Sequence, residues 1–454
     1  MNVILLGIWL IAPLFWQLML KSAGLKFTEI NIPSFTILTI YVFQYVGWPL
    51  LYFNLDEFRS EISFDHFLLT KALLLNILSI TMLIVGFNIG KKTFGNLNWS
   101  RGPNRFRNEN ESIALQETFS PSLHHTSIFL YFLILCSFST VLLYIQTIGF
   151  ENLAILVALN FVDSELPIAV ARTNMITEAA LEFHWYKLII EDFAILVCFA
   201  VFADLLIRKK LYIFIIFAML FLYTSIVLIL ATQKAPLAYF FLGLFLVHCV
   251  VNNSGNMLTR VAPYFVITLL ALLSVSYLIF TSESDFLNGV LSVLSRVFTG
   301  QLQATYLYVD YFENHSEFYF GKTLPNPGGI FDWENIKLSR QIYEKFMSKT
   351  DLGIVGTMPT IFWGELYGNF GFFGVFFGSF IIGFIIYSFN AIVFKFGSSS
   401  FSISFFIWSL LHLKNISVTA AVSLLFDIRL FLSFCMFIFI SCVVENRKFA
   451  LLKN

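Results

Sequence analysis

Runs of apolar residues long enough to cross a membrane alternate with shorter polar segments along most of the chain. A membrane helix needs about 20 predominantly apolar residues. Eleven segments meet this requirement, at residues 2–20, 34–53, 67–90, 126–148, 186–206, 211–231, 236–252, 261–280, 366–394, 400–416 and 424–443. The pattern predicts an all-α polytopic membrane protein with about 11 transmembrane helices, within a range of about 10–12.

Basic residues mark one side of the predicted membrane helices. They form three groups: Lys91, Lys92, Arg101, Arg105 and Arg107 in the polar loop at 91–125; Arg208, Lys209 and Lys210; and Arg447, Lys448 and Lys453 in the tail. With eleven crossings all three groups fall on the same side, which the positive-inside rule assigns to the cytoplasm. The N-terminus is then predicted outside and the C-terminus inside.

Two long connections, at 149–185 and 281–361, fall on the opposite, external side. The second is longer than an ordinary loop and contains aromatic residues and prolines, so we expect it to be folded. Within it, residues 291–306 have apolar positions at helical spacing and are predicted to lie on the membrane face, and residues 336–349 are predicted to form a short helix. The predicted regions are membrane helices 1–8 at 1–280, an external region at 281–361, and the last three helices with the tail at 362–454.

The composition supports a membrane class and excludes several functions. The chain is 58% hydrophobic and 12% charged, whereas soluble domains carry about 25% charged residues. The formal net charge is zero, so no nucleic-acid partner is indicated. The five cysteines lie in apolar runs without a CxxC pair, so we expect neither disulfides nor a zinc site. Residues 1–20 lack a basic start and a cleavage site, so no cleavable signal peptide is expected.

The segment 357–387 begins polar and continues as a predicted membrane helix. Gly364, Gly368, Gly371 and Gly378 would share one narrow stripe of an unbroken helix, which allows close approach of another helix in lipid. Glu365 and Asn369 stand four residues apart on a neighbouring face. Ordinary helix packing is the alternative for the glycines. For Glu365 we favour a function, because an acidic group at the edge of the hydrocarbon is costly.

Four basic residues do not follow the positive-inside pattern. Arg172 and Arg296 fall in the external loops, Lys234 lies just before Pro236 between two spans, and Arg429 lies inside the last span. Because of its depth, Arg429 is expected to pair with another helix. Together the four suit an anion with several oxygens, such as a diphosphate. The alternatives are a surface arginine for Arg172, contact with lipid headgroups for Arg296, and structural ion pairs for the other two.

Other candidate groups are weaker. Asp163 with Glu165, and Glu283 with Asp285, form acid-x-acid pairs that can hold a divalent cation, although solvated loop charge is the commoner reading. His184 stands at a membrane border among aromatic residues, where aromatic anchoring is the commoner role. The chain has no HExxH and no GxSxG motif, which argues against a metalloprotease or a serine hydrolase.

Residues 363–374 (WGELYGNFGFFG), the many spans, and the large external loop before the third-last span resemble the Wzy family, the bacterial O-antigen or oligosaccharide repeat-unit polymerases. Residues 324–330 (LPNPGGI) resemble a proline-containing segment of that family, and residues 232–236 (TQKAP) resemble its short basic turn. The chain departs from the family at Pro325–Asn326, where many members carry a Pro-Arg pair.

The resemblance implies a membrane glycosyltransferase that polymerises undecaprenyl-diphosphate-linked oligosaccharide at the periplasmic face of the bacterial inner membrane. Membrane lipid, a chain-length regulator and a flippase are the further implied partners, and no metal or cofactor is implied. The leaving diphosphate needs positive charge and the acceptor hydroxyl needs a base. The catalytic candidates are therefore Glu365, Arg172 and Arg296, and the substrate-binding candidates are Lys234, Tyr367, Asn369, Arg429 and His184.

Three other functions stay open on the sequence. A glycan ligase of similar architecture would move finished polymer to another acceptor. A flippase or transporter for lipid-linked saccharides would favour charges spread over many spans and paired halves of the chain. A metal-dependent glycosyltransferase would use the acid-x-acid pairs.

Overall fold

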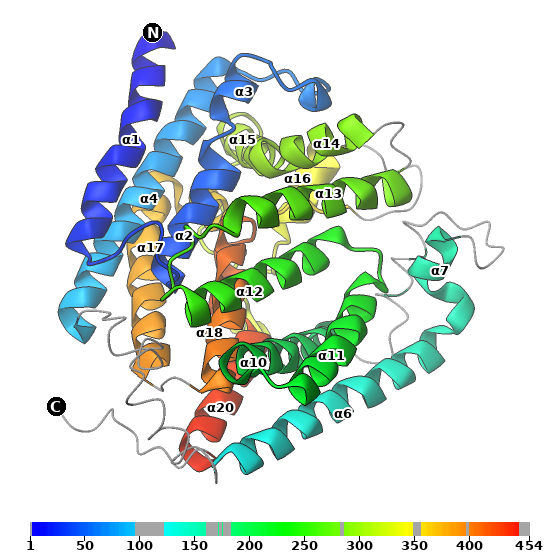
Figure 1. Cartoon of the computed structure of the whole chain (residues 1–454). Coiled ribbons are helices and arrows are strands. Elements are labelled where there is room, and N and C mark those ends of the chain that lie inside the picture. The colour runs from blue at the N-terminus through cyan, green and yellow to red at the C-terminus, as the bar shows by residue number, and fades with distance from the viewer. Residues whose placement is uncertain are drawn as a thin grey trace. The chain divides into compact units, whose positions relative to one another are not determined.

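The computed structural model describes residues 2–95, 122–159, 171, 175, 183–281, 286–347, 356–395 and 399–444. Most of these residues lie in helices, and none of them forms a β-strand (Figure 1). Helices suit an apolar chain because each helix satisfies its own backbone hydrogen bonds without water.

Within the described residues, eight helical segments are long and apolar enough to cross a membrane. They are α1 (Asn2–Ser22), α2 to α3 (Ile32–Tyr52), α4 (His66–Phe94), α6 (Ser122–Ile148), α11 (Leu211–Ile229), α12 (Lys234–Asn252), α17 (Phe362–Lys395), and α19 to α20 (Ala421–Cys442). Each coincides with one of the predicted spans. The chain is therefore an all-α, multi-pass membrane protein.

The three other predicted spans also contain apolar helices, which are not among these eight. They are α10 (Phe193–Arg208) with 16 residues, α18 (Ser400–Leu413) with 14 residues, and α13 (Ala262–Thr281) with 20 residues, of which the stretch Ala262–Ser276 was compared with the length of a span. Eleven crossings therefore stay a prediction. The assignment of loops to the two sides of the membrane also stays a prediction. If one of these three helices did not cross the membrane, every later loop would change sides.

The remaining elements are short or connect the spans. They are η1 (Tyr41–Tyr45), η2 (Glu57–Arg59), η5 (Phe150–Asn152), α7 (Ala154–Ala158), α9 (Phe183–Tyr186), η6 (Lys187–Asp192), α14 (Phe286–Phe298), α15 (Gly300–Asn314), η7 (Pro327–Gly329), α16 (Leu338–Phe346), η9 (Lys414–Ser417) and η10 (Ile440–Val444). Of these, α16 confirms the helix predicted at 336–349.

The described chain forms two compact units whose segments alternate along the sequence. Unit 1 comprises Met1–Leu97, Val290–Ala391 and His412–Asp427, and unit 2 comprises Asn98–Gly289, Ile392–Leu411 and Ile428–Asn454. The external region predicted at 281–361 therefore belongs mainly to unit 1. Each unit is described by itself.

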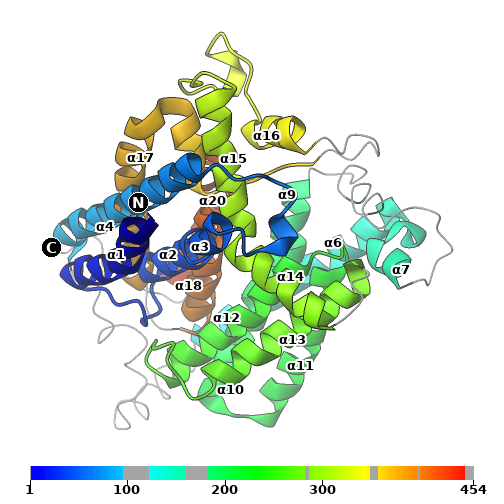
Figure 2. The same ribbon diagram turned by 90° about the horizontal axis from the view of Figure 1, so that it is seen from above.

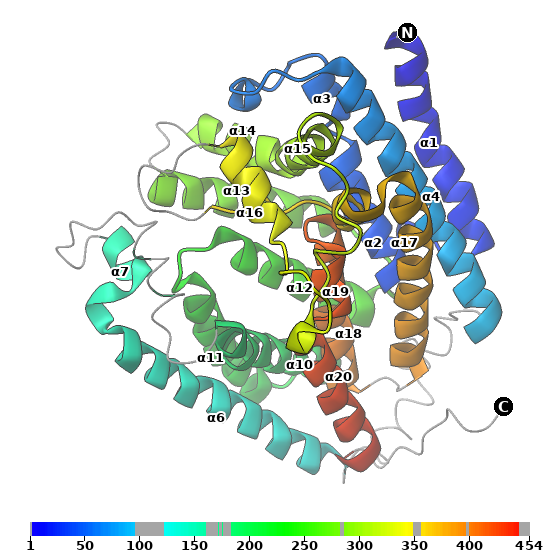
Figure 3. The same cartoon turned by 180° about the vertical axis from the view of Figure 1, so that it is seen from behind.

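In unit 1, α1, α4 and α17 lie side by side (Figures 1 and 3). α4 and α17 approach each other closely at two glycines. A Cβ on Gly86 would lie 2.3 Å from the Phe380 carbonyl oxygen, and a Cβ on Gly383 would lie 2.3 Å from the Leu83 carbonyl oxygen. The close helix pair expected for a glycine-rich membrane helix is thus present, but at Gly383 and not at the predicted stripe.

The predicted stripe itself is wrong, because α17 is not one straight helix. Gly371 has φ 58° and ψ −143°, which interrupts the helix near its start (Figure 3). As a result, Cβ atoms on Gly374 and Gly378 would meet Leu366 of the same helix, whereas one on Gly368 would meet the Phe312 ring. Equal spacing along the sequence gives one face only while the helix continues unbroken.

The stretch 291–306 also differs from its prediction. It spans two helices, α14 and α15, which are separated at Thr299. In α15, residues Leu302, Tyr306 and Leu307 are buried, and the helix packs against α4 and η1 in unit 1. The second half of this stretch is therefore part of a protein core and not a helix on the membrane face.

In unit 2, α10 packs against α11, α12 and α6, and Figure 2 shows α10 to α13 in green lying near one another. Stacked Phe199 and Phe240 rings, with centroids 5.8 Å apart, join α10 to α12. A Cβ on Gly243 would lie 2.0 Å from the Phe199 ring, so this glycine makes room for the aromatic contact.

Candidate functional site

Glu365, the carboxylate singled out in the sequence, is almost completely enclosed in unit 1. Its side chain is 5% exposed. The Val422 backbone N–H donates to Glu365 Oε2 over 3.0 Å, and further hydrogen bonds come from the Ala421 backbone and the Thr323 side chain. Glu365 thus caps the start of α19 (Ala421–Leu425), where free N–H groups favour a negative charge.

Asn369 is equally enclosed, at 1% exposed. Its Nδ2 donates to Thr323 Oγ1 over 2.7 Å and to the Glu365 carbonyl oxygen over 2.9 Å, and its Oδ1 accepts from the Gly321 N–H over 2.9 Å. The prediction that Glu365 and Asn369 share a neighbourhood is confirmed, since both hydrogen-bond Thr323. Asn369 fastens the loop after α15 to the start of α17.

Tyr367 takes part in a separate, more exposed cluster. Its hydroxyl donates a short hydrogen bond to Glu313 Oε1, and Lys71 Nζ lies 2.7 Å from Glu313 Oε2. Lys71 Nζ also lies 5.6 Å from the centre of the Tyr367 ring. Partial burial raises the pKa of the Glu313 carboxyl, but hydrogen bonds from Lys71 and Tyr367 outweigh this and hold the pKa below its ordinary value. Glu313 is therefore ionised at neutral pH.

A buried polar network holds the start of α17 in place. Trp363 Nε1 donates to Asn76 Oδ1 over 2.8 Å, and Asn76 Nδ2 donates to the Gln44 carbonyl oxygen over 3.0 Å. Thr305 Oγ1 donates to Gln44 Oε1 over 2.7 Å and lies 2.7 Å from Thr360 Oγ1. Gln44 belongs to the π-helical turn η1, a feature that often marks functional parts of helices.

Arg296 lies beside a second arginine, Arg59, from the loop after α3. A Cβ on Gly300 would lie 3.0 Å from Arg59 Nη2 and 3.4 Å from Arg296 Cδ, so the two side chains flank this glycine. Arg59 Nε donates to Ser295 Oγ over 3.2 Å, and its Nη1 donates to Gln303 Oε1 over 3.1 Å. The Arg59 guanidinium is thus oriented by α14 and α15, whereas Arg296 is exposed.

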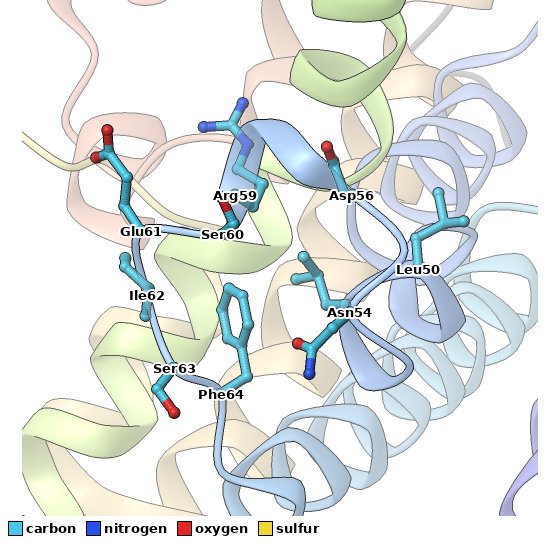
Figure 4. A pocket seen from close by; sticks show the side chains of 10 residues that line it. Leu50, Asn54, Asp56, Arg59, Ser60, Glu61, Ile62, Ser63 and Phe64 are labelled. Carbon is cyan, nitrogen blue, oxygen red and sulfur yellow. The ribbon is translucent and has the colours of Figure 1, made fainter.

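The loop that carries Arg59 encloses a pocket with a volume of about 390 Å³. The pocket is lined by Leu50, Leu51, Asn54, Asp56, Arg59, Ser60, Glu61, Ile62, Ser63 and Phe64. Figure 4 shows the loop curving around the Phe64 ring, with the charged ends of Arg59 and Glu61 pointing to the same side. Asp56 accepts a short hydrogen bond from Thr299 Oγ1, which fixes the start of the loop at the junction of α14 and α15.

Another enclosed charged group lies at 412–427 in unit 1. His412 Nε2 is 2.6 Å from Asp427 Oδ2, and Lys414, 2% exposed, donates to Asn415 Oδ1 over 2.8 Å. This segment includes α19, which Glu365 caps. Asp427 is therefore engaged with His412 within this segment.

Arg429 lies in unit 2, where it pairs with another element as predicted: its Nη1 is 3.3 Å from Asp192 Oδ2. Asp192 also accepts from Trp408 Nε1 over 3.1 Å. The arrangement supports the structural-ion-pair alternative, because a partly buried arginine is stable when a carboxylate compensates its charge.

The other predicted site residues lie outside unit 1 or outside the described residues. Lys234 is the first residue of α12 and His184 lies in α9, both in unit 2, and Arg172 lies outside the described residues. One pocket uniting all of them with Glu365 stays a prediction. The acid-x-acid pairs also lie outside the described residues, and the rest contains no group of three His, Cys, Asp or Glu side chains placed to hold a metal.

Three residues that the sequence reasoning passed over belong to these clusters: Arg59, Lys71 and Glu313. Arg59 follows the second predicted span, so it is predicted on the external side like Arg296. The same comparison with the positive-inside pattern would have found it. For Lys71 and Glu313 the sequence carries no signal, because their pairing depends on how α4 meets α15.

No protein family, no curated protein and no solved structure matches this chain. The resemblance to the Wzy family therefore rests on residues 363–374 and on the order of spans and loops. The class that the fold establishes is an all-α multi-pass membrane protein.

Proposed function

We propose that the protein polymerises oligosaccharide repeat units carried on undecaprenyl diphosphate, in the synthesis of O-antigen or a related bacterial surface polysaccharide. The bond between the growing glycan and its lipid diphosphate breaks. A hydroxyl of the new lipid-linked repeat unit forms the new glycosidic bond, and its proton passes to the departing undecaprenyl diphosphate, which is released. The reaction takes place at the periplasmic face of the inner membrane.

The observation that carries the proposal is the arginine pair at Gly300, of which Arg59 lines the pocket of about 390 Å³ and Arg296 lies on the other side of the glycine. A guanidinium binds phosphate oxygens through paired N–H groups. Two neighbouring cations repel each other, and a diphosphate bound between them relieves that repulsion while stabilising charge on the leaving group. The lining also contains two carboxylates that oppose the anion, Asp56, which is held by Thr299, and Glu61.

Within the proposed reaction Glu365 has a positioning role. Its carboxylate caps α19 and bonds Thr323, so it is committed to protein groups and shielded from an acceptor sugar. Asn369 and Glu365 together fix two segments, the loop at 319–323 and α19. Arg172 and Lys234 stay candidates for binding the second lipid-linked substrate, and His184 for contact at the membrane border, whereas Arg429 has a structural role in its pair with Asp192.

The test separates the proposed reaction from its alternatives by the product that accumulates. The gene is deleted in its own host, and lipid-linked and surface glycans are sized by electrophoresis and mass spectrometry. If the protein is a polymerase, its deletion leaves single repeat units on the surface and on the carrier lipid. Full-length polymer retained on undecaprenyl diphosphate would identify a ligase instead. Unpolymerised units trapped on the cytoplasmic face would identify a flippase.

A second experiment tests the arginine pair in the purified protein. The protein is placed in liposomes with lipid-linked repeat units from the same host, and chain growth is followed with Arg59→Ala, Arg296→Ala and the matched surface variant Lys345→Ala. We expect each arginine variant to slow chain growth about tenfold or more, and Lys345→Ala to leave it unchanged. Unchanged chain growth in both arginine variants would remove the pair from the site.

Glu61→Gln supplies a control of opposite sign. Removing this carboxylate from the pocket lining raises the local positive potential, so the apparent affinity for the diphosphate substrate should rise about twofold, and less at high salt. The measurement is the substrate concentration at half-maximal rate. A fall in affinity would mean that the anion does not bind at this pocket.

A further inference from the structure

Phe320, in the loop between α15 and α16, has an unusual conformation and an unusual exposure. Its φ is +47°, in the left-handed region that a bulky residue rarely adopts. Its side chain is also 72% exposed, and contact of a phenylalanine ring with water is unfavourable. A strained backbone that holds an apolar ring outward persists only where surrounding structure enforces it.

The enforcing contacts are backbone hydrogen bonds. The N–H groups of residues 319, 320, 321, 322 and 324 donate, in that order, to Gly368 O, Asn369 O, Asn369 Oδ1, Tyr319 O and Gly321 O, over 2.9 to 3.1 Å. Irregular backbone can lie at membrane depth only if its polar groups are satisfied by the protein. This part of the loop meets that condition for each of these five donors.

The loop is continuous with an apolar face of α17, beside which it runs (drawn yellow in Figure 2). A Cβ on Gly321 would lie 3.7 Å from Leu324 Cδ1 and 3.7 Å from Phe370 Cζ. Phe370 is 43% exposed, and Phe373, beyond the turn in α17, is 70% exposed. Exposed apolar side chains on a membrane span face lipid, so the loop extends the lipid-facing surface of α17.

The position of the turn in α17 sets the depth of the loop. After Gly371, residues 372–395 of α17 (395 − 371 = 24 residues) form a helix about 36 Å long, since each residue adds about 1.5 Å. This length alone crosses a hydrocarbon core of about 30 Å. Gly371 and the loop bonded to Gly368 and Asn369 therefore lie at the edge of the hydrocarbon, where lysine side chains extend to lipid phosphates.

We propose that residues 320–324 form a lipid-inserted loop: Phe320 and Leu324 enter the acyl-chain region next to α17, and Lys322 lies at the level of the lipid phosphates. The occupant of this surface is the bilayer itself. Phe320 adopts its strained backbone because Asn369 and the turn in α17 fix the loop, and lipid then covers the exposed ring. The inference is independent of the reaction that the protein catalyses.

Site-directed spin labelling tests the loop directly. A nitroxide is placed at Phe320→Cys in a variant lacking the five native cysteines, in liposomes of phosphatidylcholine and phosphatidylglycerol. Accessibility to oxygen, which concentrates in lipid, is compared with accessibility to a water-soluble nickel complex. The lipid control is Phe373→Cys, and the water control is Glu317→Cys, three residues away in the same loop.

We expect the ratio of oxygen to nickel accessibility at position 320 to lie within twofold of position 373 and at least fivefold above position 317. A ratio equal to that at 317 would place the loop in water and overturn the proposal. Low accessibility to both reagents, with dipolar broadening between labels, would also overturn it, because a second copy of the chain would then cover Phe320.

A second measurement avoids the cysteine-free background. Phe320→Trp and Glu317→Trp are compared with the parent protein in liposomes containing lipids brominated along the acyl chain, which quench nearby tryptophan. The added fluorescence of Phe320→Trp should be quenched by at least half and that of Glu317→Trp by little. Equal quenching in the two variants would contradict insertion of Phe320, even if the cysteine-free variants failed to fold.

Discussion

Two polar regions of unit 1 differ in how their groups are used. Around Glu365 and Asn369 the described polar atoms bond one another, and the side chains are 5% and 1% exposed. Around Arg59 and Arg296 the first guanidinium, which lines a pocket, is held by Ser295 and Gln303, while the second arginine is exposed. A closed network fixes backbone, whereas an oriented and accessible charge can bind a ligand. In the proposed site, the sequence motif therefore has a supporting role and the arginines are the groups that bind the ligand.

The largest expected effect tests the open region. Combining Arg59→Ala with Arg296→Ala should reduce chain growth by a factor of about 100 or more, because each charge-assisted contact contributes about 1.5–3 kcal/mol. In detergent, this double variant should change the thermal unfolding temperature by less than a variant of the closed region, such as Asn369→Ala, does. The comparison would fail if the double variant lost stability in proportion to activity.

Asn369→Ala tests the closed region. It removes three hydrogen bonds in a site that excludes water and should lower the free energy of unfolding by about 2–4 kcal/mol. The measurement is reversible unfolding in mixed detergent micelles. Asn314→Ala, at an exposed amide bonded only locally to Asp310, is the matched control and should stay within about 0.5 kcal/mol of the parent. Equal effects of the two variants would contradict a closed network at Asn369.

Glu365→Gln distinguishes a capping role from a chemical one. Glutamine keeps an acceptor for the Val422 N–H but loses the charge, so we expect a loss of about 1 kcal/mol in stability and less than about tenfold in chain growth. Both are measured on the purified protein. Normal stability with abolished chain growth would show that the carboxylate acts on the substrate, as the sequence reasoning first suggested.

The smallest effect concerns pH at the cluster of Lys71, Glu313 and Tyr367. The pKa of Glu313 is lowered in the folded protein, so the stability it contributes is present above the ordinary glutamate pKa of about 4.3 and is lost as the pH falls through the lowered value. The contribution should be under about 1 kcal/mol, because the side chains are partly exposed and screened by solvent. Unfolding curves of the parent and Glu313→Gln should therefore differ at pH 7 and converge near pH 3. A constant difference would exclude this titration.

Local patterns predicted the membrane class, the helix at 336–349 and the neighbourhood of Glu365 and Asn369, because helical spacing and apolar length are properties of a few consecutive residues. They failed at Gly371 and at Thr299. In both places the sequence predicts a continuous helix. After the break at Gly371, Leu366 lies against Gly374 and Gly378, and next to the break at Thr299, Arg59 bonds Ser295. No local sequence signal requires either break.

The sequence by itself determined that this protein lives in a membrane, that it is helical, and that a polar motif opens a late span. Only the tertiary structure decided which groups meet. Arg59 bonds Ser295, 236 positions later, and Glu365 caps a helix 57 positions later. Such pairings depend on which helices are neighbours in the fold. Apolar helix surfaces do not specify these neighbours, because they pack equally well against lipid or against another apolar helix. The chemical surroundings of each candidate residue therefore came from the packing and not from its motif.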